Sequence, residues 1–394
     1  MDIRAILLIG RIARDGARPA ESVGGVPIAY LDVLGLPVVE RVRQRLARFG
    51  IRRATLVSDV PPGDAAAAFT QCSALHRDMR RIDAAGEQFW QAADDTFQQY
   101  GQDGADLVLV LRIGPYAEID YEEMIQHHLD HRCAVTTAVD AENPGLDVFV
   151  LNAAGRLDAR ELFQSRLQRL RHDCQAFQVT GYVNRLQSPS DLRRLAADGL
   201  LARNEIRPHG FELKPGVWVG AAARIHRKAR VVAPAFIGAR ATVRALAVIT
   251  RGSVVEHHAE IDCGTVVENS SVLPFTRLGA GLDVMHSVVG LGRLAHLARG
   301  VEVEISDRRF VDMVPLSPLS RLAGSTAALF AFLPKQIYRG FFAPSHRKSA
   351  PESPESLEQA QPVLEVPVLE SPASGGESSG FPSSLAVVRR YGEH

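Results

Sequence analysis

Lysine is nearly absent from this sequence of 394 residues. Only four lysines occur, at positions 214, 228, 335 and 348, so the first 213 residues contain none. The cations are therefore almost all arginine, and the 45 basic residues are balanced by 45 acidic ones. Because the formal net charge is zero, the sequence gives no global electrostatic reason to expect nucleic acid as a partner.

Cysteine is also scarce, and no long apolar run occurs near position 1. The four cysteines, at positions 72, 133, 174 and 263, lack the paired spacings of zinc sites and redox motifs, and they fit reduced, mostly buried thiols. The first apolar run, residues 5–9, is too short for a signal peptide or a membrane span. We therefore expect a cytoplasmic protein.

What the sequence does have is a repeat of six residues between positions 213 and 278. Its first position is aliphatic eleven times in succession, at Leu213, Val219, Ile225, Val231, Ile237, Val243, Ile249, Val255, Ile261, Val267 and Leu273. A small residue follows four places later, at Val217, Ala223, Ala229, Ala235, Ala241, Ala247, Ser253, Ala259, Thr265 and Ser271, until Arg277 breaks the series.

This period predicts a parallel β-helix. One aliphatic side chain points inward from each short strand, and the small residue lets the backbone turn a corner without a clash with the next coil. Three strands close a coil, so eleven repeats make between three and four coils. An α-helix is excluded, because apolar positions at intervals of six move around a helix of 3.6 residues per turn. The pattern resembles the left-handed β-helix of hexapeptide acyltransferases and of some sugar nucleotidyltransferases, and the left hand is implied by this resemblance.

Strands and helices alternate over the first 200 residues. Buried strands are predicted at residues 5–9, 53–57, 107–111 and 134–139, with helices at 38–49 and 121–131. This alternation indicates an α/β domain with a mainly parallel, Rossmann-like sheet. Ligands of such sheets bind at the carboxyl ends of the strands, so the loops after Ile9 and Leu111 are expected to matter most.

Two further segments follow the repeat. Residues 313–343 are apolar and aromatic with a few basic residues, which fits packing against the coils or, alternatively, a position on a membrane surface. Residues 344–394 are rich in Pro, Ser and Glu and are expected to be disordered. The predicted divisions are therefore 1–205 for the α/β domain, 206–312 for the β-helix and its cap, 313–343 and 344–394.

Several segments of the chain resemble the nucleotide-sugar pyrophosphorylases, the sugar-1-phosphate nucleotidyltransferase family. The first strand and glycine loop (residues 4–10), the segment Leu-Gly-Leu-Pro-Val at 34–38 with its following helix, the pair Gly181-Tyr182 with Ser-Pro-Ser-Asp-Leu at 188–192, and the β-helix carry the likeness. It extends over about residues 3–312. The resemblance implies an enzyme that joins a sugar phosphate to a nucleoside triphosphate with the help of Mg²⁺.

The catalytic features of that family are missing here. Its nucleotide loop has three glycines, whereas this chain keeps only Gly10 of the three, and the bulky residues Arg11 and Ile12 should prevent that loop conformation. By the same alignment the two metal-binding aspartates fall on Gly114 and Arg185, and an arginine repels a divalent ion. A lysine of the family falls on Ile28, and its sugar-phosphate lysine has no counterpart before position 214. We predict no catalytic residues, no metal and no cofactor.

The favoured interpretation is an inactive relative that senses a nucleotide or nucleotide sugar, or that partners an active paralogue or another copy of itself through the β-helix. Three alternatives stay open. One is a working pyrophosphorylase that uses Mg²⁺ and a site rebuilt from Gly10, Arg11, Arg14, Arg112 and Arg185. The second is an acyltransferase whose general base is one of His257, His258 and His286. The third is an assembly scaffold that binds no small molecule.

Overall fold

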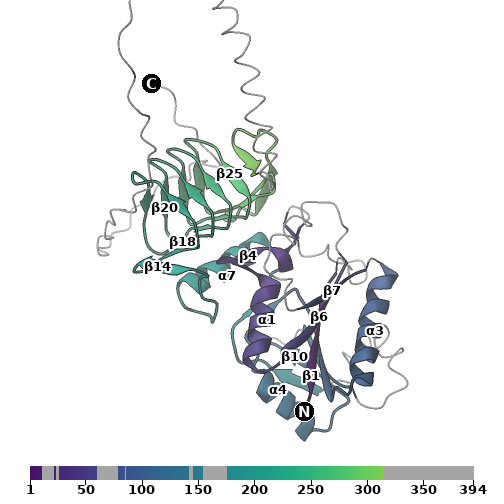
Figure 1. The fold of residues 1–394 in the computed structure, drawn as a ribbon. Coiled ribbons are helices and arrows are strands. Elements are labelled where there is room, and N and C mark those ends of the chain that lie inside the picture. The colour runs from purple at the N-terminus through teal and green to yellow at the C-terminus, as the bar shows by residue number, and fades with distance from the viewer. Residues whose placement is uncertain are drawn as a thin grey trace, which may run out of the picture.

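The structure is a computed structural model, and it describes residues 1–10, 22–23, 26–59, 79–84, 86–141, 145–153 and 175–314. It has two parts that lie against each other (Figure 1). The first, called here the α/β part, is a sheet with helices on both sides. The second, the coiled part, is a stack of short strands that begins with β14 (Phe211–Lys214).

The α/β part is built on a seven-stranded sheet in the order β12-β10-β11-β8-β1-β6-β7. Strand β11 is antiparallel to both of its neighbours, and the other pairs are parallel. The strands, in chain order, are β1 (Ile3–Ile9), β6 (Arg53–Ser58), β7 (Arg80–Asp83), β8 (Leu107–Arg112), β10 (Val135–Val139), β11 (Gly145–Asn152) and β12 (Gln175–Gln178). The mixed α/β organisation with a mainly parallel sheet therefore agrees with the sequence prediction.

Helices cover both faces of this sheet. Successive residues of β1 point to opposite faces: Leu7 packs with α1 (Val38–Arg48) and α4 (Tyr121–Asp130), whereas Leu8 packs with α3 (Glu87–Gln102). A strand covered on both faces needs apolar residues at every position, which explains the continuous apolar run in the sequence. None of the helices in the described ranges is long and apolar enough to cross a membrane.

Short elements join these layers and lead to the coiled part. They are β2 (Ser22–Val23), β3 (Val26–Pro27), the 3-10 helix η1 (Ile28–Tyr30), β4 (Asp32–Val33), β5 (Leu36–Pro37), β9 (Tyr116–Ala117), β13 (Val183–Asn184) and α7 (Pro189–Leu200). Strands β4 and β5 form a hairpin with a two-residue turn. This hairpin and α7 lie next to the coiled part, as Figure 1 shows.

The coiled part consists of three sheets, each made of every third strand. The first contains β15 (Val217–Val219), β18 (Ala235–Ile237), β21 (Val254–Val255), β24 (Ser271–Val272) and β27 (Ser287–Gly290). The second contains β16 (Arg224–Ile225), β19 (Thr242–Val243), β22 (Glu260–Ile261) and β25 (Thr276–Leu278). The third contains β17 (Arg230–Val231), β20 (Val248–Thr250), β23 (Val266–Glu268) and β26 (Asp283–Met285).

The predicted aliphatic positions fill the inside of these coils as far as Val267. Residues 18 apart pair in parallel, as Val219 does with Ile237 and Ile225 with Val243. At several corners the residue just before the small one has a positive φ: Ala222, Arg240 and His258 have φ values of 56°, 56° and 57°. Ala241 and Ala259, which follow the last two, are fully buried. At these corners the small residue thus packs beneath the turn that its predecessor makes.

The register predicted beyond Val267 is wrong by one residue. Val255 pairs with Val272, an interval of 17, and Val272 rather than Leu273 enters the core of the coils. The pattern then continues through Leu278, Val284 and Val289, so the coils extend beyond position 278. Leu273 instead joins the apolar cluster shared with the α/β part. The predicted cap is correspondingly shorter and consists of β28 (Arg293–His296), β29 (Val301–Glu304) and β30 (Val311–Met313), all antiparallel to their neighbours.

Buried serine hydroxyls accompany the shortened coils. Ser253, Ser270 and Ser287 stand 17 residues apart at the same corner. The Ser270 hydroxyl accepts a hydrogen bond from the Ser287 N–H at 3.0 Å, and the Ser253 hydroxyl accepts one from the Ser270 N–H at 3.3 Å. Each hydroxyl accepts from a backbone N–H group of the next coil. The loss of one residue from the coil brings the two groups together at the corner. The segments 313–343 and 344–394 of the sequence prediction lie, beyond Val314, outside the described residues.

The serine corner gives a prediction with a matched control. Ser270→Ala leaves the buried Ser287 N–H without its acceptor, and we expect the free energy of unfolding to fall by about 1–3 kcal/mol. The neighbouring Ser271 hydroxyl is buried with no hydrogen-bond partner among the described residues, so Ser271→Ala should be neutral or stabilising. Urea unfolding of both variants measures the difference, and equal losses would contradict this account of the corner.

Candidate functional site

The first candidate site lies at the carboxyl ends of the parallel strands. The chain leaves β1 for β6 and β7 on one side and later returns to β8 on the other. The edge between β1 and β8 is therefore the point where the strand order reverses, and ligands of open α/β sheets bind outside such a point. Gly10 follows β1 directly, and Arg112 ends β8.

Gly10 occupies a tight position at this edge. A Cβ atom added there would lie 3.2 Å from Cζ of Phe89, a residue of α3. Any larger residue would therefore have to displace the Phe89 ring, which is buried and also makes an edge-to-face contact with Trp90. Arg11 and Arg14, the next two residues predicted for the site, lie outside the described residues.

Arg112 and Arg185 are both engaged with aspartates. Arg112 Nη1 lies 3.3 Å from Asp147 Oδ2, across the pair of strands β8 and β11. Arg185 forms an ion pair with Asp140, which follows β10. The two aspartate side chains are only 10% and 13% exposed. Each arginine thus neutralises a carboxylate that is largely removed from water, and neither stands as a free cation for a phosphate group.

The same pairs bear on the metal that the family resemblance implies. A divalent cation of this kind needs several oxygen ligands. Gly114 has no side chain that could coordinate the ion, and the Asp140 carboxylate is paired with the guanidinium of Arg185. Within the described ranges no three His, Cys, Asp or Glu side chains come together as a metal site would require. The residues present at this edge therefore do not fit a metal ion.

A buried hydroxyl pair at the end of β6 was missed by the sequence analysis. Tyr30 Oη and Ser58 Oγ lie 2.6 Å apart, and the Arg81 guanidinium carbon lies 5.8 Å from the centroid of the Tyr30 ring. Burial raises the pKa of the Tyr30 hydroxyl, which keeps it protonated and neutral. No spacing in the sequence links positions 30 and 58, so only the fold reveals this pair.

The second candidate site is the junction of the two parts. Leu34 and Gly35 form the turn of the β4–β5 hairpin with φ values of 54° and 88°. Their N–H groups donate to the two carboxylate oxygens of Glu256, at 2.8 and 2.9 Å. A Cβ atom on Gly35 would lie 2.9 Å from Cζ of Phe236. The turn therefore needs glycine, both for its positive φ and for this close approach to the coils.

His257 and Asp32 form an ion pair in the same junction. His257 Nδ1 lies 2.6 Å from Asp32 Oδ2, and the two side chains are 15% and 4% exposed. His257 Nε2 is buried with no hydrogen-bond partner among the described residues. The ring also contacts Phe275 edge-on, with a centroid distance of 4.9 Å. The sequence analysis named His257 only as a candidate general base, whereas the structure directs it to the α/β part and pairs it with Asp32.

The three histidines predicted for acyl transfer occupy two different corners. His258 stacks on Phe275 with an interplanar angle of 16°, beside His257. His286 lies on another corner, where its Nδ1 is 2.7 Å from Asn269 Nδ2. The His257–Asp32 pair orients a ring as a general base requires, but the free nitrogen of that ring faces packed side chains. This arrangement gives an acceptor hydroxyl or amine no access to that nitrogen. The acyltransferase function remains a prediction.

Arg193 ties the junction together from α7. Its Nη2 donates to the Gly252 carbonyl at 2.7 Å and to Asn269 Oδ1 at 2.9 Å. Burial lowers the pKa of Arg193 to about 10, which still leaves it charged at neutral pH. Helix α7 and the hairpin therefore hold the coils through polar contacts. The sequence alone does not reveal these contacts, because each contact joins residues more than fifty positions apart.

Comparison with known proteins adds little to this geometry. No family model matches the chain, and no curated protein matches it either. Two solved structures of HddC from Yersinia pseudotuberculosis, one of them complexed with GMP-PN, are 14% identical to it with TM-scores of 0.35. They match 50% and 49% of this chain and 98% and 97% of their own. A likeness at this level leaves the function to be inferred from the chain's own residues.

The junction predicts a particular pH dependence of stability. Burial, followed by the nearby Asp32 charge, raises the pKa of Glu256 from 4.5 to about 8. Burial alone would lower the pKa of His257, but its charge interaction and hydrogen bond with Asp32 outweigh that effect and raise it above 6.5. Both groups bind protons more tightly in the folded state, so their stabilisation is complete below the unfolded pKa values and is lost as pH rises through the folded ones.

We therefore expect the midpoint of thermal unfolding to fall by several degrees between pH 5 and pH 8. In Glu256→Gln the slope against pH should be smaller, although the protein is less stable at every pH because an amide cannot accept from both N–H groups. Glu260→Gln, on the outer side of the same coil, removes the same charge away from the junction and should keep the wild-type slope. An unchanged slope in Glu256→Gln would exclude this origin.

Proposed function

We propose that this chain is a sugar nucleotidyltransferase-like protein that binds a nucleotide or nucleotide sugar and does not turn it over. The proposal rests on the motifs shared with nucleotide-sugar pyrophosphorylases at residues 4–10, 34–38 and 181–192, and on the α/β part that these motifs occupy. Its role would be that of a cytoplasmic sensor or regulatory subunit in nucleotide-sugar or surface-polysaccharide metabolism.

The observation that carries the proposal is the pair of internal salt bridges at the edge of the sheet. Transfer of a nucleotidyl group brings two polyanions together, and it needs cations and a metal ion at the point of reaction. Arg112 and Arg185 are the described cations closest to that role, and each is held by an aspartate. Because these charges already compensate one another, they supply no free cation for the transfer reaction, which favours a protein that does not turn its ligand over.

The coiled part supports the regulatory half of the proposal. We infer that it is a left-handed parallel β-helix of the hexapeptide kind, and that residues 1–205 and 206–312 are the two domains of the chain. The outer side of its first sheet packs against the α/β part, through Phe236, Val254 and Val288. The second and third sheets keep outer faces to which an active paralogue or a second copy of the chain can bind.

The proposal is tested by calorimetry with a panel of nucleotides and nucleotide sugars, with and without Mg²⁺. We expect micromolar binding of one nucleotide or nucleotide sugar that does not depend on Mg²⁺, together with no release of pyrophosphate from any pair of sugar phosphate and nucleoside triphosphate. Release of pyrophosphate would show a working enzyme with a rebuilt site. Absence of all binding would leave an assembly scaffold and would contradict the proposal.

A pair of variants tests where the ligand binds. Arg112→Gln removes a guanidinium from the carboxyl ends of the strands and leaves the Asp147 carboxylate unneutralised, so it should weaken the binding of an anionic ligand about tenfold or more. Arg53→Gln removes the same charge from the opposite edge of the same sheet, where the side chain is 70% exposed. Calorimetry should find this control unchanged, and equal effects of the two variants would place the ligand elsewhere.

A further inference from the structure

The first coils carry charge of one sign only. Between positions 214 and 255 the sequence contains eight cations and no acidic residue. They are Lys214, Arg224, Arg227, Lys228, Arg230, Arg240, Arg244 and Arg251. Acidic residues return at Glu256 and then recur at Glu260, Asp262 and Glu268. The coiled part is therefore polarised along its axis, although the whole chain has a formal net charge of zero.

Five of these cations have no acidic partner among the described residues. They are Arg224, Arg227, Lys228, Arg230 and Arg240; the ion pairs of this region involve Arg244 and Arg251 instead. Four of the five belong to β16, β17 and the corner between these strands. Like charges so close together repel one another, and their repulsion is relieved when an anion binds.

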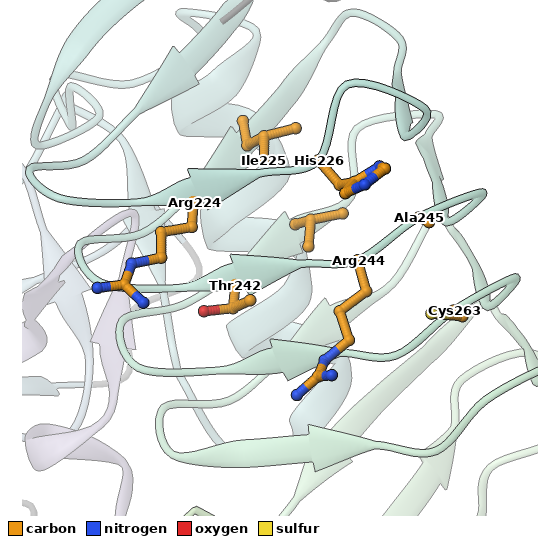
Figure 2. A pocket seen from close by; sticks show the side chains of 8 residues that line it. Arg224, Ile225, His226, Thr242, Arg244, Ala245 and Cys263 are labelled. Carbon is orange, nitrogen blue, oxygen red and sulfur yellow. The ribbon is translucent and has the colours of Figure 1, made fainter. Parts of the chain in front are cut away.

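A groove lies beside these cations on the outer face of the second sheet. It has a volume of about 380 Å³ and is lined by Arg224, Ile225, His226, Thr242, Val243, Arg244, Ala245 and Cys263. Figure 2 shows Arg224 and Arg244 extending over this face from neighbouring strands, with Thr242 between them. Two guanidinium groups, a hydroxyl and an imidazole are the donors that phosphate oxygens accept from.

The register of the strands sets the spacing of these donors. Arg224 stands beside Thr242 on the next strand, and Val243 beside Ile225. Neighbouring strands lie about 4.8 Å apart, so cations on successive coils reach the two ends of a short polyanion. Asp262, on the third coil, lies 3.7 Å from Arg244 and 3.3 Å from Arg277 and limits the positive region on that side.

We propose that this groove binds a small molecule that carries a diphosphate group. The recess is of a size that suits a small ligand, and the cations around it exceed what a single phosphate would neutralise. The acidic residues of the third coil border the positive region, which makes it too short for an extended polymer. The site is separate from the strand edge of the α/β part, so it stands whether or not the function proposed above holds.

The test uses pyrophosphate as the probe, with inorganic phosphate for comparison, in calorimetry at low and at moderate salt. We expect pyrophosphate to bind to the full chain more tightly than phosphate. Arg224→Gln and Arg244→Gln should each weaken the binding of pyrophosphate about tenfold or more. The same losses should appear in a chain that already carries Arg112→Gln at the strand edge, which separates this site from the one proposed above.

Arg240→Gln is the matched control. Arg240 belongs to the same coils and likewise has no acidic partner among the described residues, but it does not line the groove. Its removal should change the affinity less than twofold. Equal losses in Arg224→Gln and Arg240→Gln would mean attraction by net charge alone and would overturn the proposal. Absence of pyrophosphate binding by the wild type, or binding of anionic vesicles in its place, would overturn it as well.

Cys263 provides a second readout that does not depend on affinity. Its thiol is free, exposed and part of the groove wall, whereas the free thiol of Cys133 lies in the α/β part and is half-buried. Pyrophosphate should slow the alkylation of Cys263 by N-ethylmaleimide, followed by mass spectrometry of the peptides, and leave the rate at Cys133 unchanged. Equal rates at Cys263 with and without pyrophosphate would place the probe outside the groove.

Discussion

The two parts of this protein are held in one arrangement by the buried carboxyl group of Glu256. It accepts hydrogen bonds from the two N–H groups at the turn of the β4–β5 hairpin, groups that no strand partner serves. A buried backbone donor without an acceptor costs about as much as a whole hydrogen bond contributes. The hairpin therefore packs against the coils at the position of Glu256. Asp32 and His257 form their ion pair beside this contact.

This junction also explains which faces of the coiled part remain free. The outer side of the first sheet, with Phe236 and Val254, is occupied by the hairpin and α7. The second sheet keeps its arginines toward solvent, and the groove lies there. Because the coiled part has three sheets, using one for the α/β part fixes the two that are left for ligands or partners.

Much of this fold could be predicted from the sequence, because its strongest signals are local. A strand covered on both faces must be apolar throughout, which places β1 and β8, and a coil core needs one aliphatic residue in each strand. The slip after Val267 escaped prediction for the same reason. Val272 and Leu273 are both aliphatic, so the period of six continues unbroken while the backbone shortens by one residue. In the structure the pairing of Val255 with Val272 and the hydrogen bonds of the Ser253 and Ser270 hydroxyls across coils show the shorter register.

The candidate sites could be predicted less well. Arg112 and Arg185 were found because the family resemblance directs attention to their positions, but their partners Asp147 and Asp140 were not, since each pair joins strands far apart in sequence. The contrast between the two sets of arginines is physical. A carboxylate that is nearly buried must be paired, so the sheet edge compensates its charges internally. Arginines exposed on the coils remain hydrated even where a carboxylate lies nearby, as Asp262 does beside Arg244, and this leaves them available to an anion.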